Sequence, residues 1–242
     1  NLLTGHYPKS EALYRLCLVK RSEIYAEKHP YILRCQKGLG LILLTQGKYV
    51  AAKAIIEQHI QLASSTLGAK HPEVLNSKHS LAGVYLGLGQ LDLADSLYRQ
   101  TLALRRSVLG REHVSSLQSQ VKLAQVLRLQ QGFAEALPLI DEALARLSQV
   151  LGFEHHISLD VAQQKAELML DTGKINQALS LAKEVLTTRQ KILGNGHPKL
   201  IETYTLLAKT ELANSQAAQA EVYWQQAEAL AQKHNIGLMQ DT

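Results

Sequence analysis

The chain lacks several features that characterise whole classes of protein. It has only 2 cysteines and 5 prolines in 242 residues, and aromatic side chains make up 5% of it. Two cysteines cannot build a disulfide scaffold, and the longest apolar run, residues 39–44, is far shorter than the ~18–20 residues that span a bilayer. An apolar content of 46% excludes a disordered chain. We therefore expect a folded protein that does not insert into a membrane.

The start of the chain and its cysteines bear on origin and location. No signal peptide is visible, and the chain opens on Asn1 rather than Met, so we expect it to be part of a longer protein. Cys17 and Cys35 fall in predicted helices, where they are expected to be unpaired packing residues. Unpaired cysteines and the absence of a targeting segment suit a reducing cytosol, so the sequence predicts a cytoplasmic location.

The net charge of +5 is unevenly distributed. Residues 1–70 hold 10 Lys or Arg against 4 Asp or Glu, whereas residues 71–242 hold 16 against 17. A nucleic-acid-binding protein usually gathers basic side chains in one patch together with aromatic residues that stack on bases. The few aromatic residues here occupy apolar helical positions, so we expect no nucleic-acid partner.

The most informative feature is a repeat with a period of 42 residues. A Leu-Gly pair recurs at this spacing at Leu67-Gly68, Leu109-Gly110, Leu151-Gly152 and Leu193-Gly194. Histidines follow the same spacing: His29, His71, His113, His155 and His197. A column of small residues consists of Gly40, Ala82, Ala124, Ala166 and Ala208, and a column of alanines of Ala52, Ala94, Ala136, Ala178 and Ala220. A period of this length predicts a repeat architecture.

Each repeat reads as two helices. In the second repeat Pro72 suits a first helical turn, and Gly89 is expected to end that helix. A second helix is expected over about residues 91–109, closed by Gly110 in a left-handed conformation. Small residues are expected where two helices cross closely. The columns therefore predict an all-α array of packed helix pairs, in which repeats contact only their neighbours.

The repeat predicts one array with eleven helices over the whole chain, and both ends are expected to belong to a longer array or to be covered by other segments. Its parts are a half repeat at 6–27, full repeats at 28–69, 70–111, 112–153, 154–195 and 196–237, and a tail at 238–242.

The motif Leu81-Ala82-x-x-Tyr85-x-x-x-Gly89-x-x-x-x-Ala94-x-x-x-Tyr98 resembles the tetratricopeptide repeat (TPR). The Leu-Gly-x-x-His-Pro joint and the long second helix are similar to the kinesin light chain subclass. The resemblance covers essentially the whole chain. It implies a right-handed α-solenoid superhelix of antiparallel helix pairs, whose first helices line a concave groove that receives a peptide or a partner helix.

The resemblance also implies which side chains line the groove. They are Arg34, Lys37, Leu41, Asn76, His79, Gln118, Lys122, Gln125, Arg128, Asp160, Gln163, Glu167, Glu202 and Thr205. The first three repeats offer a basic and amide-rich lining, and the last two a more acidic one. Such a lining favours an acidic or mixed-polarity partner segment.

One departure from the subclass bears on specificity. Kinesin light chains carry an asparagine just before the Leu-Ala pair in most repeats, where it holds the peptide backbone. The equivalent positions here are Gly38, Ser80, Lys122, Gln164 and Leu206. We therefore do not expect this chain to recognise the kinesin-type cargo motif.

The histidines and acidic residues do not indicate a catalytic or metal site. Histidines one repeat apart lie roughly 20 Å from one another, too far to share a zinc ion, so they are expected to brace the turns. The sequence has no Gly-x-Ser-x-Gly motif and no glycine-rich phosphate loop after a strand. We expect no enzyme activity, no cofactor and no metal.

Three functions remain open. The first is a scaffold or adaptor that docks a peptide or helix of another protein in its groove. The second is a regulatory module, gated by a ligand or peptide, that controls an output domain in the same or another chain. The third is a structural spacer that self-associates through its outer face.

Overall fold

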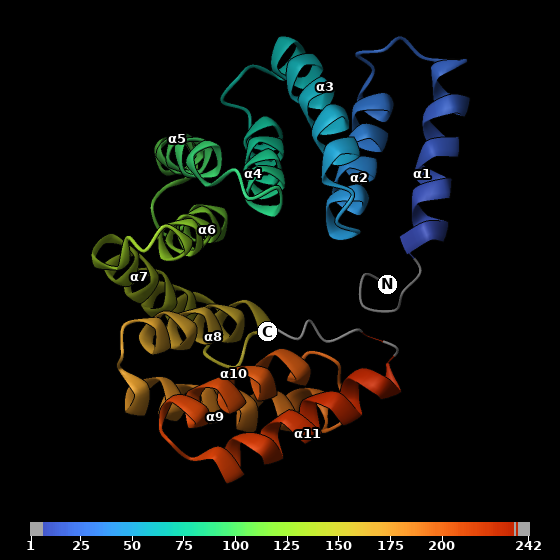
Figure 1. The fold of residues 1–242 in the computed structure, drawn as a ribbon. Helices are drawn as coiled ribbons and strands as arrows, with labels where there is room; N and C mark the ends of the chain where they lie inside the picture. The colour runs from blue at the N-terminus through green and yellow to red at the C-terminus, as the bar shows by residue number, and fades with distance from the viewer. Residues whose placement is uncertain (1–6, 235, 237–242) are drawn as a thin grey trace. The chain divides into compact units, whose positions relative to one another are not determined.

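The structure, a computed structural model, describes residues 7–234 and residue 236. This part of the chain is all-α, with no strand, and contains the expected number of helices (Figure 1). They are α1 (Tyr7–Ser22), α2 (Pro30–Thr45), α3 (Tyr49–Leu67), α4 (Pro72–Gly87), α5 (Leu91–Leu109), α6 (Val114–Leu129), α7 (Phe133–Leu151), α8 (His156–Asp171), α9 (Ile175–Leu193), α10 (Leu200–Ala213) and α11 (Ala217–Lys233).

The helices form two compact units, which divide at Gln130 and Gln131. The first unit contains α1 to α6, and the second contains α7 to α11. Within each unit, helices that follow one another in the chain pack together as antiparallel neighbours (Figure 1). The helices that open successive repeats also touch: α2 with α4 and α4 with α6 in the first unit, and α8 with α10 in the second. The predicted fold of stacked helix pairs is thereby confirmed, while the predicted tail at 238–242 lies outside the described residues.

The joint histidines brace the turns, as expected. In all five, Nδ1 accepts a hydrogen bond of 3.1–3.3 Å from the backbone N–H two residues later. In four of the joints this amide belongs to the first helical turn, where it has no partner within the helix. In the fifth it is the amide of Lys199, one residue before α10. The 42-residue spacing of histidines is therefore a spacing of helix starts.

The helix ends show one agreement and one difference from expectation. Gly89 has φ +71°, and the N–H of Gln90 after it donates to the carbonyl of Tyr85 at 2.9 Å, which closes α4. Gly110 also has a positive φ, of 96°, but its ψ of 160° is extended rather than left-handed helical. The chain therefore leaves α5 in an extended conformation, and residues 110–113 connect it to α6.

The small columns are buried where helices cross. The alanine column from Ala52 to Ala220 is 0–3% exposed. A Cβ atom added to Gly40 would lie 2.6 Å from Cγ1 of Ile56, so a larger residue would push α2 and α3 apart. Another repeat position carries Leu39, Leu81, Leu123 and Leu207, and the fourth repeat has Lys165 there. Lys165 Nζ pairs with Asp141 Oδ1 at 2.8 Å.

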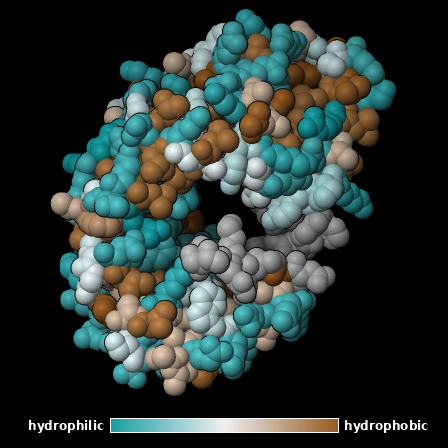
Figure 2. Space-filling view, viewed as in Figure 1, coloured by the Kyte–Doolittle hydropathy of each residue, from teal (hydrophilic) through white to brown (hydrophobic). Residues whose placement is uncertain are grey.

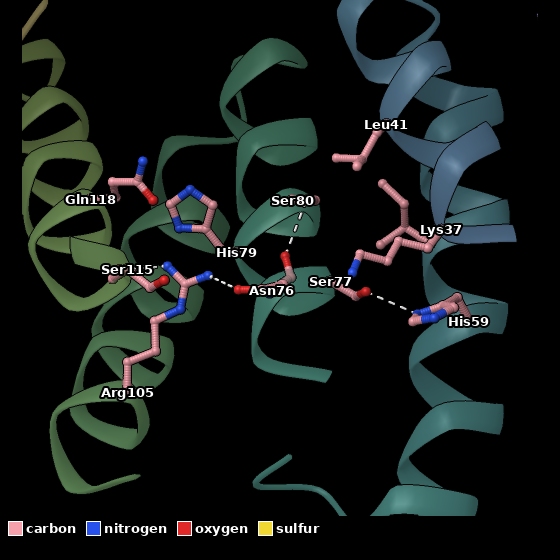
Figure 3. A pocket seen from close by; sticks show the side chains of 11 residues that line it. Lys37, Leu41, His59, Asn76, Ser77, His79, Ser80, Arg105, Ser115 and Gln118 are labelled. Atoms are coloured by element: carbon pink, nitrogen blue, oxygen red, sulfur yellow. Dashed lines mark hydrogen bonds between the residues drawn. The ribbon is translucent and has the colours of Figure 1, made fainter. Parts of the chain in front are cut away.

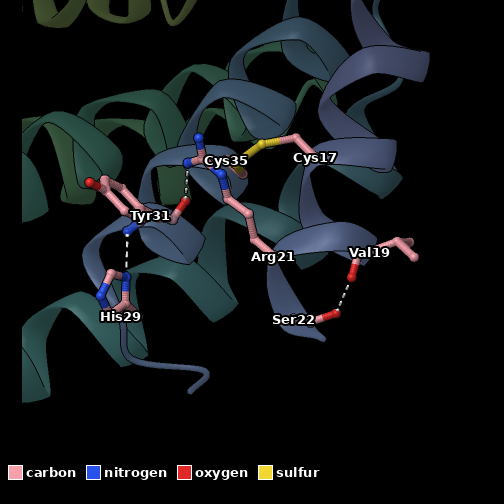
Figure 4. The surroundings of a disulfide bond; sticks show 7 residues. All are labelled: Cys17, Val19, Arg21, Ser22, His29, Tyr31 and Cys35. Atoms are coloured by element: carbon pink, nitrogen blue, oxygen red, sulfur yellow. Dashed lines mark hydrogen bonds between the residues drawn. A yellow bond between two sulfur atoms is a disulfide. The ribbon is translucent and has the colours of Figure 1, made fainter. Parts of the chain in front are cut away.

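The cysteines differ from expectation. Cys17 of α1 and Cys35 of α2 form a disulfide rather than staying unpaired (Figure 4). They occupy the position where, one repeat later, His59 and Ser77 meet through a 2.9 Å hydrogen bond between Nδ1 and Oγ. This contact joins the second helix of one repeat to the first helix of the next. The distance between Cys17 and Cys35 along the sequence does not reveal that they are close in space.

The surface offers no dominant apolar patch on the face drawn in Figure 2, where hydrophobic side chains lie in small groups between hydrophilic ones. The exposed large apolar residues are spread from Leu13 on α1 to Val222 on α11. Leu13, Leu16 and Val19 follow one another at a spacing of three residues and so share one side of α1, whereas exposed apolar side chains that stand singly elsewhere are ordinary. None of the described helices is both long enough and apolar enough to cross a lipid bilayer.

Candidate binding site in the first unit

The first unit contains a cavity of about 320 Å³ between side chains of α2 to α6 (Figure 3). This volume is at the lower end of the range for small-ligand sites, about 300–1,000 Å³. Its lining consists of Lys37, Leu41, Ile56, His59, Asn76, Ser77, His79, Ser80, Arg105, Ser115 and Gln118. None of these residues is acidic, and two of them, Lys37 and Arg105, are cationic.

Five of the predicted groove residues meet in this lining. Lys37 and Leu41 project from α2, Asn76 and His79 from α4, and Gln118 from α6 (Figure 3). These are the helices that open successive repeats, so their shared face follows from the repeat register. As residues that bind a partner, all five stay predictions.

Arg105 of α5 also lines the cavity, and the sequence analysis did not identify it as a site residue. Its side chain is only 3% exposed. Nη1 donates to the backbone carbonyl of Ser115 and to Oγ of Ser119, both at 2.7 Å, and Nη2 donates to Oδ1 of Asn76 at 2.6 Å. Nε is buried and has no hydrogen-bond partner among the described residues. All three acceptors are neutral groups.

This arginine belongs to a pattern that recurs at every second repeat and could have been found in the sequence. Arg21, Arg105 and Arg189 are 84 residues apart, whereas the repeats between them carry Ala63 and Leu147 at the same position. Arg21 uses the same contact as Arg105, because its Nη1 donates to the backbone carbonyl of Tyr31 at 3.2 Å (Figure 4). A search for columns with a 42-residue period does not detect a residue that appears in every second repeat.

His79 stands beside this arginine as a neutral side chain. Its Nδ1 lies 3.1 Å from Oγ of Ser119, and its ring packs edge-on against Tyr98 at a centroid distance of 5.2 Å. Burial, together with the positive charges of Arg105 and Lys122, lowers the pKa of His79 to about 3. Burial lowers the pKa of Arg105 to about 10, so the guanidinium stays charged at neutral pH while the imidazole does not.

The opposite wall of the cavity is built around His59 of α3. Besides its bond to Ser77, its Nε2 lies 3.7 Å from Oε1 of Glu73, and Lys37 Nζ lies 3.9 Å from the same oxygen. Burial lowers the pKa of His59 despite the neighbouring carboxylate. The contact between Lys37 and Glu73 is long for an ion pair, and Lys37 also lines the cavity.

The remaining predicted residues of the first unit lie outside the cavity lining. Arg34 is exposed on α2. Lys122 donates from Nζ to Oε1 of Gln125 at 2.9 Å, which ties these two α6 residues together. Arg128 is half-buried near the end of the same helix.

In the second unit, Asp160 and Gln163 belong to a buried arginine cluster. Arg189 of α9 is 2% exposed. Its Nη2 donates to Oδ1 of Asp160 at 2.6 Å, and its Nη1 donates to Oε1 of Gln163 and, at 2.6 Å, to Oγ1 of Thr203. Gln163, expected to face a groove, is only 6% exposed and also accepts from Thr203 at 3.0 Å. Its polar atoms serve the packing of α8, α9 and α10.

The other predicted residues of the second unit are more accessible. Lys199 Nζ lies 2.8 Å from Oε2 of Glu202 and 3.4 Å from Oδ1 of Asp160. Glu202 is exposed, and Glu167 and Thr205 are half-buried. Within the described residues, no group of three or more His, Cys, Asp or Glu side chains could hold a metal ion. The groove predicted across all five repeats stays a prediction.

The chain belongs to the tetratricopeptide repeat family. The family model matches four overlapping segments, residues 43–107, 73–149, 113–191 and 157–233. Together they cover most of the chain, and the two-helix repeats with their small crossing residues fit this assignment.

Solved structures identify the kind of repeat more closely. The nearly identical TPR-like repeats of a Podosopora anserina protein described as a kinesin light chain share 30% identity, with a TM-score of 0.66 over 85% of this chain and 97% of that one. BtubC (BKLC) from P. vanneervenii has a TM-score of 0.73 at 16% identity, over 98% and 94% of the two chains. The resemblance to kinesin light chain-like TPR proteins is therefore confirmed.

A third structural neighbour is a regulator. The Rap conjugation gene regulator of the plasmid pLS20, in complex with the Phr* peptide, has a TM-score of 0.69 at 14% identity, over 88% of this chain and 57% of that one. At this identity the likeness shows the fold alone. No curated protein matches the chain.

Proposed function

We propose that this protein is a non-catalytic interaction scaffold that docks a peptide or helix of a partner protein on the face formed by α2, α4 and α6. The observation that carries the proposal is the cavity on this face, where Lys37, Asn76, His79 and Gln118 converge from three successive repeats. TPR proteins in general are interaction modules. A face shared by several repeats suits an extended ligand, because each repeat contributes one set of contacts at a regular spacing.

The charge of this face favours an acidic or mixed-polarity partner. No acidic side chain is present in the cavity lining, and the first 70 residues carry the excess of Lys and Arg. The Rap regulator supports the peptide as ligand, since the same fold holds the Phr* peptide there. A cytoplasmic location stays a prediction, and the pairing of Cys17 with Cys35 removes one of its two arguments.

Selection from a random peptide library tests the proposal. The full chain is immobilised, bound peptides are sequenced, and their affinities are measured by fluorescence anisotropy. A variant with Arg34→Glu, Lys37→Glu and Lys122→Glu reverses three charges on the proposed face, and we expect at least tenfold weaker binding of the selected peptides.

The matched control reverses the same number of charges on exposed residues away from this face: Lys28→Glu, Lys70→Glu and Arg111→Glu. Circular dichroism verifies that both variants keep their helices. Equal weakening in the two variants would mean that net charge, rather than the α2, α4 and α6 face, holds the peptides. Failure of the native chain to select any peptide would contradict the proposal.

A further inference from the structure

We propose that the cavity beside Arg105 binds a single carboxylate group of the docked peptide, with Arg105 as its charge partner. This inference rests on the proposed function and names the chemistry of its anchor. Arg105 lies on α5, the second helix of its repeat, and is not among the residues that the resemblance assigns to a groove.

The first argument is the unmatched charge of Arg105. A buried guanidinium is costly unless a negative charge offsets it. Arg189, at the equivalent position two repeats later, has the carboxylate of Asp160 at 2.6 Å. Arg105 has the neutral amide of Asn76 in that place, and no carboxylate pairs with it anywhere in the described chain. The same framework thus holds one compensated arginine and one that lacks a counter-charge.

The second argument is the space in front of Arg105. The guanidinium lines a cavity of about 320 Å³, and its Nε is buried without a partner. Two further side-chain donors line the same space, Lys37 Nζ from α2 and the amide of Gln118 from α6, while the Ser80 hydroxyl already donates to the carbonyl of Asn76 at 3.1 Å (Figure 3). A carboxylate placed there would meet two cationic side chains, Lys37 and Arg105, and the amide of Gln118. The lining itself has no acidic side chain, although the Glu73 carboxylate contacts Lys37 and His59 beside it.

The size and walls of the cavity favour a carboxylate over a larger anion. Leu41 and Ile56 form an apolar part of the lining, which suits the carbon chain that carries a carboxylate. Only two cationic side chains face the space, whereas phosphate carries more charge and usually collects several. A peptide can supply the carboxylate from its C-terminus or from an Asp or Glu side chain, and the test separates these sources.

The test uses small probes and the intact chain labelled with ¹⁵N. N-acetyl-leucine carries a main-chain carboxylate, N-acetyl-aspartic acid α-amide carries a side-chain carboxylate, and N-acetyl-leucine amide carries none. Inorganic phosphate is the fourth probe. We expect one of the two carboxylates to shift the Nε–H resonance of Arg105, assigned by its loss in Arg105→Lys, and the amide to leave it unchanged.

Asn76→Asp is the decisive variant, because it places inside the protein the carboxylate that Arg189 already has. We expect this variant to stay folded and to bind the carboxylate probe at least tenfold more weakly. The matched control Asn176→Asp makes the same chemical change on an exposed residue of α9 and should leave binding unchanged. The reverse change, Asp160→Asn, should leave the response of Arg105 unaltered.

Several results would overturn the inference. They are unchanged probe binding in Asn76→Asp, a response of Arg105 to the amide as strong as to the carboxylates, or tighter binding of phosphate than of either carboxylate. If library-selected peptides bind equally well to the native chain and to Asn76→Asp, the scaffold function stands and the Arg105 anchor is wrong. If a carboxylate probe binds through Arg105 but no peptide is selected, the anchor stands and the scaffold function fails.

Discussion

Arg105 in the first unit and Arg189 in the second occupy the same position of the repeat, yet their surroundings differ in charge. Each guanidinium bridges three helices and donates to a residue of the preceding first helix and to a hydroxyl of the following one. Asn76, His79 and Ser119 surround Arg105, and Asp160, Gln163 and Thr203 surround Arg189. The backbone framework is the same, and the side chains decide how the charge is balanced.

The same repeat position thus has a structural role at Arg189 and, in our proposal, a binding role at Arg105. In the second unit the carboxylate of Asp160 balances the charge of Arg189, and Gln163 and Thr203 accept its remaining hydrogen bonds. In the first unit the amide of Asn76 contributes a dipole but no charge, and the cavity leaves room for a ligand to supply it. A repeat protein can therefore keep its packing and still vary which of its units is open to an acidic group.

The largest expected effect comes from deleting the two arginines in turn. Arg189→Ala removes a charge-assisted network and should lower the free energy of unfolding by about 3–4 kcal/mol. Arg105→Ala removes hydrogen bonds to neutral acceptors and should cost about 2 kcal/mol. Urea unfolding followed by circular dichroism measures both losses. Equal losses would mean that the counter-charge of Asp160 adds nothing to the cluster.

The next effect is a pH dependence of folding stability that arises from His79 in the first unit. The pKa of His79 is about 3 in the folded chain against an ordinary value of 6.5. Between these values the unfolded chain binds the proton and the folded chain does not, so stability is lost as the pH falls from 6.5 towards 3.

The slope attributable to His79 should approach 1.4 kcal/mol per pH unit, or about 2–3 kcal/mol between pH 6.5 and 4.5. His79→Gln installs the residue that the second unit has at position 163 and should remove this part of the slope. Thermal unfolding of both proteins at several pH values gives the difference. Parallel curves would show that His79 has the same pKa in the folded and the unfolded chain, contrary to its burial.

Exchanging Asn76 and Asp160 should have a smaller effect of opposite sign in the two units. Asn76→Asp should raise stability by about 1 kcal/mol, since a charge-assisted hydrogen bond is stronger than a neutral one. Asp160→Asn should lower stability by a similar amount, moderated because the Asp160 side chain is 39% exposed. Melting temperatures of the two variants provide the measurement. Destabilisation by Asn76→Asp would show that the Arg105 cluster does not tolerate a carboxylate at this site.

The smallest effect concerns how the first helix of a repeat ends. Gly47 and Gly89 in the first unit and Gly173 in the second have positive φ at this register position, whereas Ser215 in the last repeat has φ +59° without being glycine. Ser215→Gly should stabilise the chain by about 0.5 kcal/mol, because glycine adopts this conformation without strain. Gly89→Ser is the reverse control and should destabilise it. A melting temperature lowered by Ser215→Gly would contradict this explanation.

The fold follows from local features that recur from repeat to repeat. Histidine caps such as His71, prolines such as Pro72 and turn glycines such as Gly89 fix helix starts and ends from neighbours in the chain. The α5 bounds, Leu91–Leu109, agree with the predicted range for that reason. The difference at Gly110 arises because its ψ depends on where the next helix lies, and no residue type encodes that.

The candidate site could be predicted only in part. The shared face of Lys37, Asn76 and Gln118 follows from the repeat register, since helices that open successive repeats present equivalent positions together. Arg105 and His59 come from second helices, whose long side chains reach between neighbouring first helices. The sequence contains both residues, but which neighbours they meet depends on how closely the helices cross.

The sequence by itself determined an all-α chain of two-helix repeats with a 42-residue period, because capping, turn and packing residues act within a few positions of one another or at a fixed spacing. Only the tertiary structure decided the pairing of Cys17 with Cys35, the burial of Gln163 and the unmatched charge of Arg105. These features arise where three helices meet. There the outcome depends on the partner that packing brings within hydrogen-bond distance, and a single change from Asp to Asn leaves the helices in place while altering the chemistry between them.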